Sequence, residues 1–298
     1  MKKIFLTGAS GFLGGHILRT SPNNTRILAQ YQNHYIVSSS GTIDKIQMDF
    51  TTSSWQKVID FEPDVIIHTA AMAKLEDCET NPSKARAVND EATRQLVDLA
   101  RQLGARFIYT STDQIFDGYH GHYTESDLPN PLNVYGLTKY DPEPYILKTH
   151  DDAVVIRCAL IYGMSLNGSS TFTEKMVNRL REGRPVNLFT DEFRSPILVT
   201  NLAEVIWELV NNDFHGAINV GGSQKVSRYE MGEIACAILG VPTKFLNPVR
   251  AAEIEFAAYR PVDCSFNTSF ASGILTTPLL DCHEGLTRAF SMERVAVG

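Results

Sequence analysis

The sequence predicts an α/β fold: a doubly wound parallel sheet with a smaller, interleaved C-terminal lobe. Short apolar runs alternate with longer amphipathic segments, which is typical of β-α-β units around a parallel sheet. The runs are nearly continuous in apolar residues, as strands buried on both faces require. A glycine-rich segment follows the first run and opens a helical segment, as expected at the first junction of such a sheet.

The first half of the chain supplies the predicted sheet and its crossover helices. Strands are predicted at residues 3–6, 26–31, 65–68, 106–110 and 154–157. Helices are predicted at 11–20, 84–103 and 144–148, and Asn81-Pro82-Ser83 is a start signal for the second. Beyond Arg157 we predict a loop at 163–170, a helix near 172–181 and strands at 187–189 and 217–220. Residues 221–298 are less regular and are expected to cap the sheet.

Composition and charge narrow the classes of partner. The chain of 298 residues has a formal charge of −7 and no broad basic surface, so we expect neither nucleic acid nor a membrane as partner. No apolar run approaches the roughly 18 to 20 residues of a membrane span, and the start lacks a signal-peptide core. The cysteines are scattered without a C-x-x-C pair, as expected of reduced thiols in a cytoplasmic protein: Cys78, Cys158, Cys236, Cys264 and Cys282.

The segment Thr7-Gly8-Ala9-Ser10-Gly11-Phe12-Leu13-Gly14 lies at the first strand–helix junction. Glycines let the backbone turn tightly and approach a phosphate, while free N–H groups and the helix dipole favour the anion. This segment therefore predicts a dinucleotide site. The second strand ends in Tyr31-Gln32-Asn33-His34, and no Asp or Glu precedes Asp44. Because the usual acidic anchor for the ribose of NAD is missing, we expect NADP, with NAD as the alternative.

Three further side chains predict the chemistry. Tyr135 and Lys139 are spaced i, i+4, so one helical turn places them on a shared face. A nearby ammonium favours the phenolate, so we expect Lys139 to lower the pKa of Tyr135 and ease proton transfer. Thr112 follows the apolar run at 107–110, where strand ends of a parallel sheet meet the ligand crevice. A hydroxyl, a phenol and an ammonium beside a dinucleotide fit carbonyl reduction or alcohol oxidation.

Together these features resemble an extended short-chain dehydrogenase/reductase, and within that superfamily the chain most resembles the dTDP-4-dehydrorhamnose reductase branch. The resemblance runs from Lys3 to about Asp263. It rests on T-G-A-S-G-F-L-G at 7–14, H-T-A-A at 68–71, Asn89, S-T-D-Q-I-F-D-G at 111–118, P-L-N-V-Y-G-L-T-K at 131–139 and Arg260-Pro261.

The resemblance implies a Rossmann-type fold with a dinucleotide-binding domain at 1–161, returning segments near 186–220, and a smaller substrate lobe at 162–185 and 221–298. It implies Thr112, Tyr135 and Lys139 as catalytic residues. The implied cofactor contacts are Gly8, Gly11, Phe12, Leu13, Gly14, Ala70, Ala71, Tyr135 and Lys139, with Asp49 and Phe50 beside the adenine. The candidate substrate contacts are Lys74, Asp113 and Arg260, since cations suit phosphate oxygens.

The implied activity is the NAD(P)H-dependent reduction of a nucleotide-linked 4-keto-6-deoxy sugar. Related 4,6-dehydratases carry Asp-Glu after the catalytic threonine, whereas this chain has Asp113-Gln114. A glutamine cannot accept the proton, so dehydration is disfavoured. Two alternatives stay open: a nucleotide-sugar epimerase with tightly bound NAD, and a non-catalytic dinucleotide-binding regulatory subunit with a protein partner.

Two departures from the family pattern change the expectations. Pro142 and Pro144 follow the lysine, and prolines disrupt a helix interior, so we expect the helix that carries Lys139 to be kinked or restarted near Pro144. Gln114 stands where the reductase branch usually has an aromatic residue, so a changed sugar pocket is expected. In the resembling reductases magnesium is a dimer-associated ion. A homodimer is compatible with this sequence, which names no magnesium ligands and predicts no metal site of its own.

Overall fold

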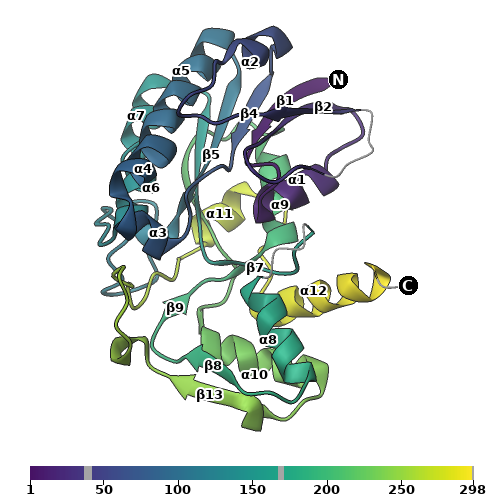
Figure 1. The fold of residues 1–298 in the computed structure, drawn as a ribbon, viewed down its shortest axis with the longest axis vertical. Coiled ribbons are helices and arrows are strands. Elements are labelled where there is room, and N and C mark those ends of the chain that lie inside the picture. Colours follow the sequence, from purple (N-terminus) through teal and green to yellow (C-terminus); the bar gives the residue numbers. More distant parts are fainter. Residues whose placement is uncertain (37–41, 167–170, 297–298) are drawn as a thin grey trace.

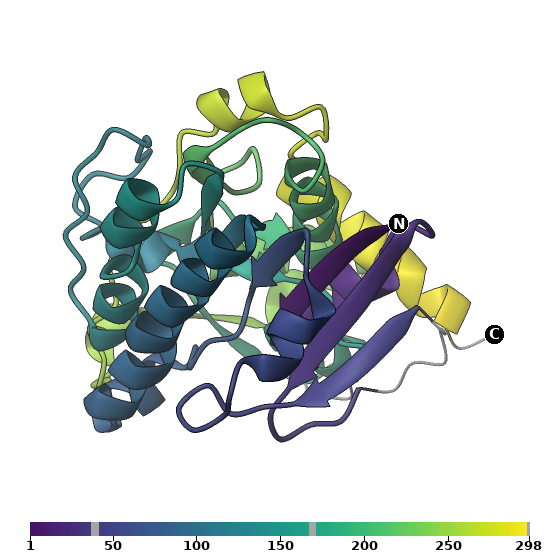
Figure 2. The ribbon, with the colours of Figure 1, turned by 90° about the horizontal axis from the view of Figure 1, so that it is seen from above.

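The computed structural model describes residues 1–36, 42–166 and 171–296. A large parallel sheet is covered by helices on both faces, and a smaller lobe lies at one end of it (Figure 1). The view from above in Figure 2 shows helices on either side of the twisted strands. The predicted fold class, a doubly wound α/β fold with a parallel sheet, is confirmed.

The large sheet has seven strands in the order β11-β6-β5-β4-β1-β2-β3, and all neighbours are parallel. The chain starts at the centre, runs outward to β3 and then returns to β4. The strand order therefore reverses between β1 and β4, which is where open parallel sheets bind ligands. The strands are β1 (Lys2–Thr7), β2 (Thr25–Tyr31), β3 (Ile43–Gln47), β4 (Val65–His68), β5 (Arg106–Thr112), β6 (Ala153–Cys158) and β11 (Gly216–Val220).

The buried side chains of the helices divide between the two faces. Along β1, Ile4 and Leu6 point to one core and Phe5 to the other, as the alternation of a strand requires. The first core is covered by α1 (Phe12–Arg19), α9 (Val199–Leu209) and α11 (Ser269–Ile274). The second is covered by α2 (Gln56–Phe61), α5 (Ala92–Leu103) and α7 (Glu143–Thr149), with α3 (Leu75–Thr80), α4 (Pro82–Arg86) and α6 (Val134–Tyr140) on the same side.

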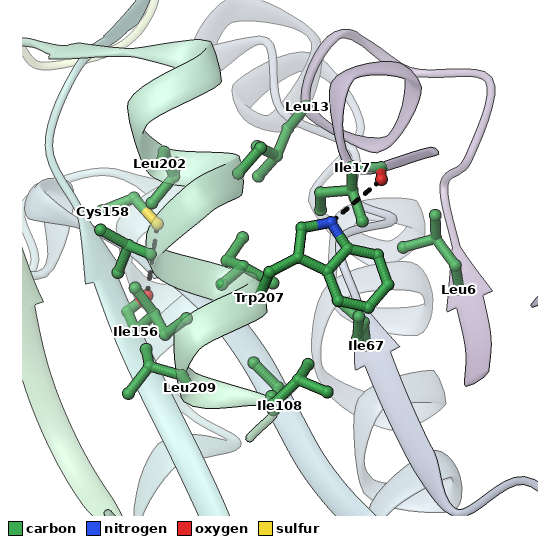
Figure 3. Packing of buried hydrophobic residues seen from close by; sticks show 14 of the residues in the cluster. Leu6, Leu13, Ile17, Ile67, Ile108, Ile156, Cys158, Leu202, Trp207 and Leu209 are labelled. Atoms are coloured by element: carbon green, nitrogen blue, oxygen red, sulfur yellow. Dashed lines mark hydrogen bonds between the residues drawn. The ribbon is translucent and has the colours of Figure 1, made fainter. Parts of the chain in front are cut away.

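Trp207 ties the first face together. Its indole packs among buried side chains of α1, α9 and the sheet, and its ring N–H donates to the carbonyl oxygen of Ile17 at 3.1 Å (Figure 3). An unpaired buried donor costs roughly 1–3 kcal/mol, so this acceptor is needed where the indole is buried. The bond fixes α9 to α1, the helix that the glycine motif opens.

The smaller lobe confirms the helix predicted near 172–181. Capping boxes start two of its helices, with Thr171 paired to Glu174 and Ser227 paired to Glu230. Its helices are α8 (Phe172–Arg181), α10 (Arg228–Leu239) and α12 (Cys282–Ala296), and its strand pairs are β8 (Val186–Phe189) with β13 (Leu246–Val249), β9 (Phe193–Arg194) with β12 (Val226–Ser227), and β7 (Ile161–Tyr162) with β10 (Ile197–Leu198). Short 3₁₀ turns occur at Asp113–Ile115, Thr243–Phe245 and Ala251–Glu253.

The structure corrects the predicted division of the chain at two segments. β8 pairs with β13 in the smaller lobe, so the return to the large sheet begins at α9 and not near residue 186. α11 was assigned to the lobe but packs on the large sheet, in the first core. Both segments are short, and tertiary contacts decide their place. Of the loop predicted at 163–170, residues 167–170 lie outside the described part.

Two local features of the sheet domain are not predicted from the sequence. β3 is not predicted, because its residues I-D-K-I-Q lie at the sheet edge and bury a single side chain, that of Ile46. The helix predicted at 84–103 contains a π-helical turn at Ala87–Glu91 between α4 and α5. Such turns often lie at functional sites, and this one carries Asn89.

Candidate active site

The glycine motif forms a close junction between β1 and α1. Gly8 has a φ of 65°, in the left-handed region, and a Cβ there would lie 2.8 Å from the amide nitrogen of Ala70. A Cβ on Gly14 would lie 2.2 Å from the carbonyl oxygen of Gly8, so α1 approaches the turn only without a side chain. This junction is the kind of backbone cradle that phosphate binding at a helix start requires.

A cavity of about 230 Å³ opens beside this junction. It collects most of the predicted cofactor contacts, namely Gly8, Gly11, Asp49, Phe50, Ala70 and Ala71. Three other cofactor contacts predicted in the glycine motif, Phe12, Leu13 and Gly14, do not line it. Leu13 is buried in the core, Gly14 packs against Gly8, and Phe12 lies beside Gly163. Direct contact of these three with a cofactor stays a prediction.

The end of β2 faces the same cavity through Gln32, Asn33 and His34. These residues include no carboxylate, but Asp49, which the resemblance places beside the adenine, reaches them from beyond β3, where Gln32 Nε2 donates to Asp49 Oδ2 at 2.8 Å. Hydrogen bonds from Thr51 hold the pKa of Asp49 below its usual value, so this carboxylate is ionised at neutral pH. The described residues that line the cavity include no Lys or Arg.

The predicted catalytic residues meet where β5 ends against α6. Thr112 is the last residue of β5, and Tyr135 and Lys139 lie one turn apart on α6. Thr112 and Tyr135 line the same cavity, and Thr112 acts on the Tyr135 phenol closely enough to oppose the rise of its pKa. Thr112 Oγ1 also accepts from the Gln114 amide at 3.2 Å and donates to Asp113 Oδ1 at 3.2 Å. The structure thus places the hydroxyl and the phenol together, with a carboxylate beside them.

Backbone contacts hold α6 close to the end of β5. Asn133 caps the helix, since its Oδ1 accepts from the Gly136 amide at 2.7 Å. A Cβ on Gly136 would lie 2.1 Å from the carbonyl oxygen of Gln114, so this approach requires glycine. From the π-helical turn, Asn89 Nδ2 donates to Thr138 Oγ1 at 3.1 Å. Tyr135 and Lys139 are therefore fixed by the neighbours of α6 on two sides.

Burial decides the protonation of Tyr135 and Lys139. It raises the pKa of Tyr135 above its usual value, against the opposing hydrogen bond from Thr112. Burial also lowers the pKa of Lys139 to about 7, against the opposing charges of Cys158 and Glu143. Desolvation of the phenol outweighs any attraction to the Lys139 ammonium, so the net pKa of Tyr135 is raised, and a lowering by Lys139 itself stays a prediction. A phenol that keeps its proton is suited to act as an acid.

The proline segment restarts the helix, as predicted. α6 ends at Tyr140, and α7 begins at Glu143 with Pro142 in the capping position and Pro144 in the first turn. Prolines are tolerated there because the first helical N–H groups have no partner within the helix. The break falls beyond Lys139, so the turn that joins Tyr135 to Lys139 is intact.

A second cavity, of about 380 Å³, lies between the sheet and the smaller lobe. It includes the predicted Thr112, Asp113, Tyr135 and Arg260. Lys74 does not line it, since its side chain is 85% exposed and faces Asp77 at 3.9 Å. The lining residues are Ala73, Leu75, Ser111, Thr112, Asp113, Gln114, Tyr135, Cys158, Ala159, Leu160, Ile161, Glu192, Arg194, Val226, Arg228, Met231 and Arg260.

Three charged residues of this cavity are not predicted from the sequence as substrate contacts: Glu192, Arg194 and Arg228. Arg194 Nε lies 3.5 Å from Asp113 Oδ2. Four buried atoms of the lining have no hydrogen-bond partner among the described residues, namely Asp113 Oδ2, Glu192 Oε1, Arg228 Nη1 and Arg260 Nε. Buried polar groups normally form hydrogen bonds, so several without one along a cavity indicate a polar ligand. In the sequence these residues are single charges in an irregular region and carry no periodic signal.

No group of three or more His, Cys, Asp or Glu side chains is placed to hold a metal ion among the described residues. None of the helices in the described ranges has the length and apolar character to cross a bilayer.

Comparisons with known proteins agree with this geometry. The family model described as RmlD substrate binding domain matches residues 1–294. A Haloferax volcanii protein named probable low-salt glycan biosynthesis reductase Agl14 is 29% identical over 91% of this chain and 91% of its own length. The rat methionine adenosyltransferase 2 subunit beta is 28% identical over 89% of this chain and 81% of its own length.

Two solved structures extend the comparison. A hypothetical dTDP-4-dehydrorhamnose reductase from Sulfolobus tokodaii is 32% identical, with a TM-score of 0.82 over 96% of this chain and 99% of its own. The dTDP-4-dehydrorhamnose reductase of Bacillus anthracis, solved with NADP, is 25% identical, with a TM-score of 0.83 over 98% of this chain and all of its own. These matches confirm the resemblance found in the sequence, and the chain belongs to the RmlD substrate binding domain family.

Proposed function

We propose that this protein catalyses the NAD(P)H-dependent reduction of a nucleotide-linked 4-keto-6-deoxy sugar, as a dTDP-4-dehydrorhamnose reductase does. One observation carries the proposal: Thr112 and Tyr135 line a polar cavity whose neighbour along the strand ends is the glycine cradle. The reductase activity named for the relatives supports it. The buried free cysteines fit a reducing compartment, so a cytoplasmic location belongs to the proposal, and a homodimer stays a prediction.

The residues of the first cavity fit a dinucleotide. Gly8 and Gly14 leave space that any side chain would fill, and Asp49 offers an ionised acceptor beside Phe50, as expected for adenine. When bound, the reduced nicotinamide supplies a hydride for a carbonyl carbon. Ala70 lies at the reversal of strand order, where the dinucleotide would cross the sheet.

The residues around the second cavity supply the proton and hold the reacting oxygen. Tyr135 remains protonated because burial raises its pKa, so it can donate its proton to the alkoxide oxygen formed on reduction. Thr112 would bind the same oxygen by turning its hydroxyl proton from Asp113 to the substrate, while its Oγ1 accepts from the Gln114 backbone amide. Lys139 binds the ribose hydroxyls through its ammonium. The side-chain amide of Gln114 donates from Nε2 to Asp113 and cannot take up a proton, so the site does not support dehydration.

An absorbance assay tests the activity and the cofactor together. We expect rapid oxidation of NADPH when dTDP-4-keto-6-deoxy-L-mannose is added. We expect a lower kcat/KM with NADH, because the residues that end β2 include no acidic one and Asp49 is expected at the adenine rather than at the ribose. Equal turnover of the two cofactors would contradict the NADP preference. Asp49→Asn is the matched variant. If Asp49 contacts the adenine, this substitution should lower the affinity for NADPH and for NADH alike. A gain for NADPH alone would place this carboxylate at the ribose instead.

The same assay separates the two alternatives. An epimerase would be purified with NAD already bound and would need no added reductant. The match to a methionine adenosyltransferase subunit keeps a regulatory role as the second candidate. Binding of NADPH without oxidation across a panel of sugar nucleotides, with a protein that co-purifies, would favour that role over catalysis.

Arg228 is expected to bind the substrate at the diphosphate. Its Nη1 is buried without a partner and its guanidinium stacks 4.2 Å from the ring of Phe172, so it is held for an anion. We expect Arg228→Met to raise KM about 10- to 100-fold with little change in kcat, since a charge-assisted hydrogen bond contributes roughly 1.5–3 kcal/mol. Steady-state kinetics and the inhibition constant of dTDP measure this.

Arg250→Met is the matched control for the Arg228 variant. Arg250 also lies in the C-terminal region, but its side chain is 63% exposed and lines neither cavity. Its KM should stay within about twofold of the unmodified protein. An unchanged KM and dTDP inhibition in Arg228→Met would show that this guanidinium does not bind the substrate.

A further inference from the structure

A buried ion pair lies directly behind the catalytic residues. Arg157 donates to Glu143 Oε2 through Nε at 3.0 Å and Nη2 at 2.9 Å, and Ser111 Oγ donates to Glu143 Oε1 at 2.5 Å. The exposures are 1% for Glu143, 5% for Ser111 and 6% for Arg157. The three residues come from α7, β5 and β6, so the network joins the restarted helix to the centre of the sheet.

The residues of this network are close in the sequence to the proposed catalytic residues. Ser111 precedes Thr112 on β5, and Glu143 follows Lys139 by four residues across the proline break. Lys139 is 2% exposed, and its Nζ lies 4.3 Å from the centre of the Tyr109 ring. In the described part of the chain it has no ion pair within 4.0 Å. A buried ammonium in this position needs another source of negative potential.

The groups whose charges act on Lys139 come from every element packed around it. They are Glu143 on α7, Cys158 on β6 and Cys78 on α3, with the neutral Tyr109 on β5, His68 on β4 and Tyr135 on α6 as further titratable neighbours. Burial raises the pKa of Cys78 and Cys158 and lowers that of His68, so these three are neutral near pH 7. Glu143 alone among these groups brings a negative charge to Lys139 at that pH.

Stability alone gives a weak reason for such a network. A buried ion pair usually contributes no more than well-packed apolar side chains of the same volume, because both charges lose their hydration. Burial raises the pKa of Glu143 above its usual value, and the bonds from Arg157 and Ser111 oppose that rise. The two-bond pairing with Arg157 favours the charged carboxylate, four residues along the chain from Lys139.

We propose that Glu143, held by Arg157 and Ser111, is a positioning residue that maintains Lys139 as an ammonium in the desolvated site. The role of Lys139 in binding the ribose rests on the proposed function, whereas its protonation by this network can be measured without cofactor or substrate. Glu143 touches no reacting atom and acts through Lys139.

The direction of the effect follows from the charges. Removing the negative charge of Glu143 lowers the pKa of Lys139, so the ammonium is lost at a lower pH than in the unmodified protein. In Glu143→Gln we expect the titration midpoint of Lys139 to fall from about 7 by about one unit or more, since an opposite charge nearby shifts a pKa by roughly 1–3 units. Glu143→Asp keeps the charge and should recover most of the shift.

The experiment is a carbon NMR titration of the cofactor-free protein labelled at the lysine ε-carbons, with the Lys139 signal assigned by its loss in Lys139→Met. Glu143→Gln leaves Arg157 without a counter-charge, so Glu143→Gln/Arg157→Gln is measured beside it as a neutral pair that is expected to fold. A lowered midpoint in Glu143→Gln supports the proposal. The double variant also loses the opposing positive charge of Arg157, so its midpoint should lie between those of Glu143→Gln and the unmodified protein. A midpoint unchanged in the variants that fold overturns it, and so does a midpoint lowered equally by Glu143→Asp.

A second measurement connects the network to cofactor binding. The pH above which NADPH affinity declines should move downward in Glu143→Gln by the shift seen for Lys139, because the ribose contact needs the ammonium. A purely structural role would weaken binding equally at all pH values and would leave the NMR midpoint in place. If no dinucleotide binds at any pH, the proposed function fails, while the NMR titration still decides the role of Glu143.

Discussion

Tyr135→Phe is expected to lower kcat for ketone reduction by about 10²- to 10⁴-fold, the range that a positioned general acid contributes. The change removes one oxygen atom and leaves the ring that α6 presents to the cavity. A water molecule would lack the fixed position of this half-buried side chain, which lines the cavity beside Thr112. Single-turnover oxidation of NADPH measures this step without interference from product release.

The control for this prediction is Tyr140→Phe. Tyr140 ends the same helix but lines neither cavity, so its variant should keep kcat within about twofold. NADPH affinity should remain within about threefold in both variants, because the phenol acts on the substrate oxygen. Near-normal turnover in Tyr135→Phe would refute the assignment of the proton donor, and a loss of NADPH affinity would assign the residue to the cofactor instead.

Local chemistry explains why the sheet domain could be predicted from the sequence. Strands buried on both faces give continuous apolar runs. The junction after β1 has no room for side chains at Gly8 and Gly14, so this requirement appears directly in the sequence as glycines. The spacing of Tyr135 and Lys139 fixes their shared face once a helix is assumed. These features depend on residues close in the sequence, so they could be found without the fold.

The charged wall of the substrate cavity could not be found in that way. Glu192 lies in the turn before β9, Arg194 lies on β9, and Arg228 starts α10. Only the packing of the lobe on the sheet brings them to Asp113. Only the family resemblance points to Asp49, because this residue follows β3 and meets Gln32 at the end of β2 through a hydrogen bond. Charges of this kind have no period, so their meaning depends on tertiary contacts.

The net pKa of the proposed catalytic tyrosine depends on packing for a related reason. Spacing alone puts the ammonium of Lys139 near the phenol of Tyr135 and suggests a lowered phenol pKa. The structure adds the burial of Lys139 and the partial burial of Tyr135, and desolvation opposes charge on each of them. The size of this effect depends on how many neighbours cover the pair, which no local pattern contains.

The second large effect is expected for Gly14→Ala. The new methyl group would lie 2.2 Å from the carbonyl oxygen of Gly8 and 2.8 Å from the Cα of Ala9, and both are backbone atoms that cannot rotate away. α1 must therefore move from the turn, which opens the cradle and separates the helix start from the phosphates. Overpacking of this kind costs typically about 1–3 kcal/mol, more than the roughly 1 kcal/mol that alanine adds to a helix.

Calorimetric titration and thermal unfolding test this prediction together. We expect Gly14→Ala to lose at least about 30-fold in NADPH affinity, equivalent to roughly 2 kcal/mol, and to unfold at a lower temperature. Gly273→Ala is the matched control, because its Cβ would meet no atom within 4 Å in α11. That control should keep its NADPH affinity and its unfolding temperature or gain slightly. If Gly14→Ala behaved as the control does, the close contact between α1 and the Gly8 turn would not be what forms the cofactor site.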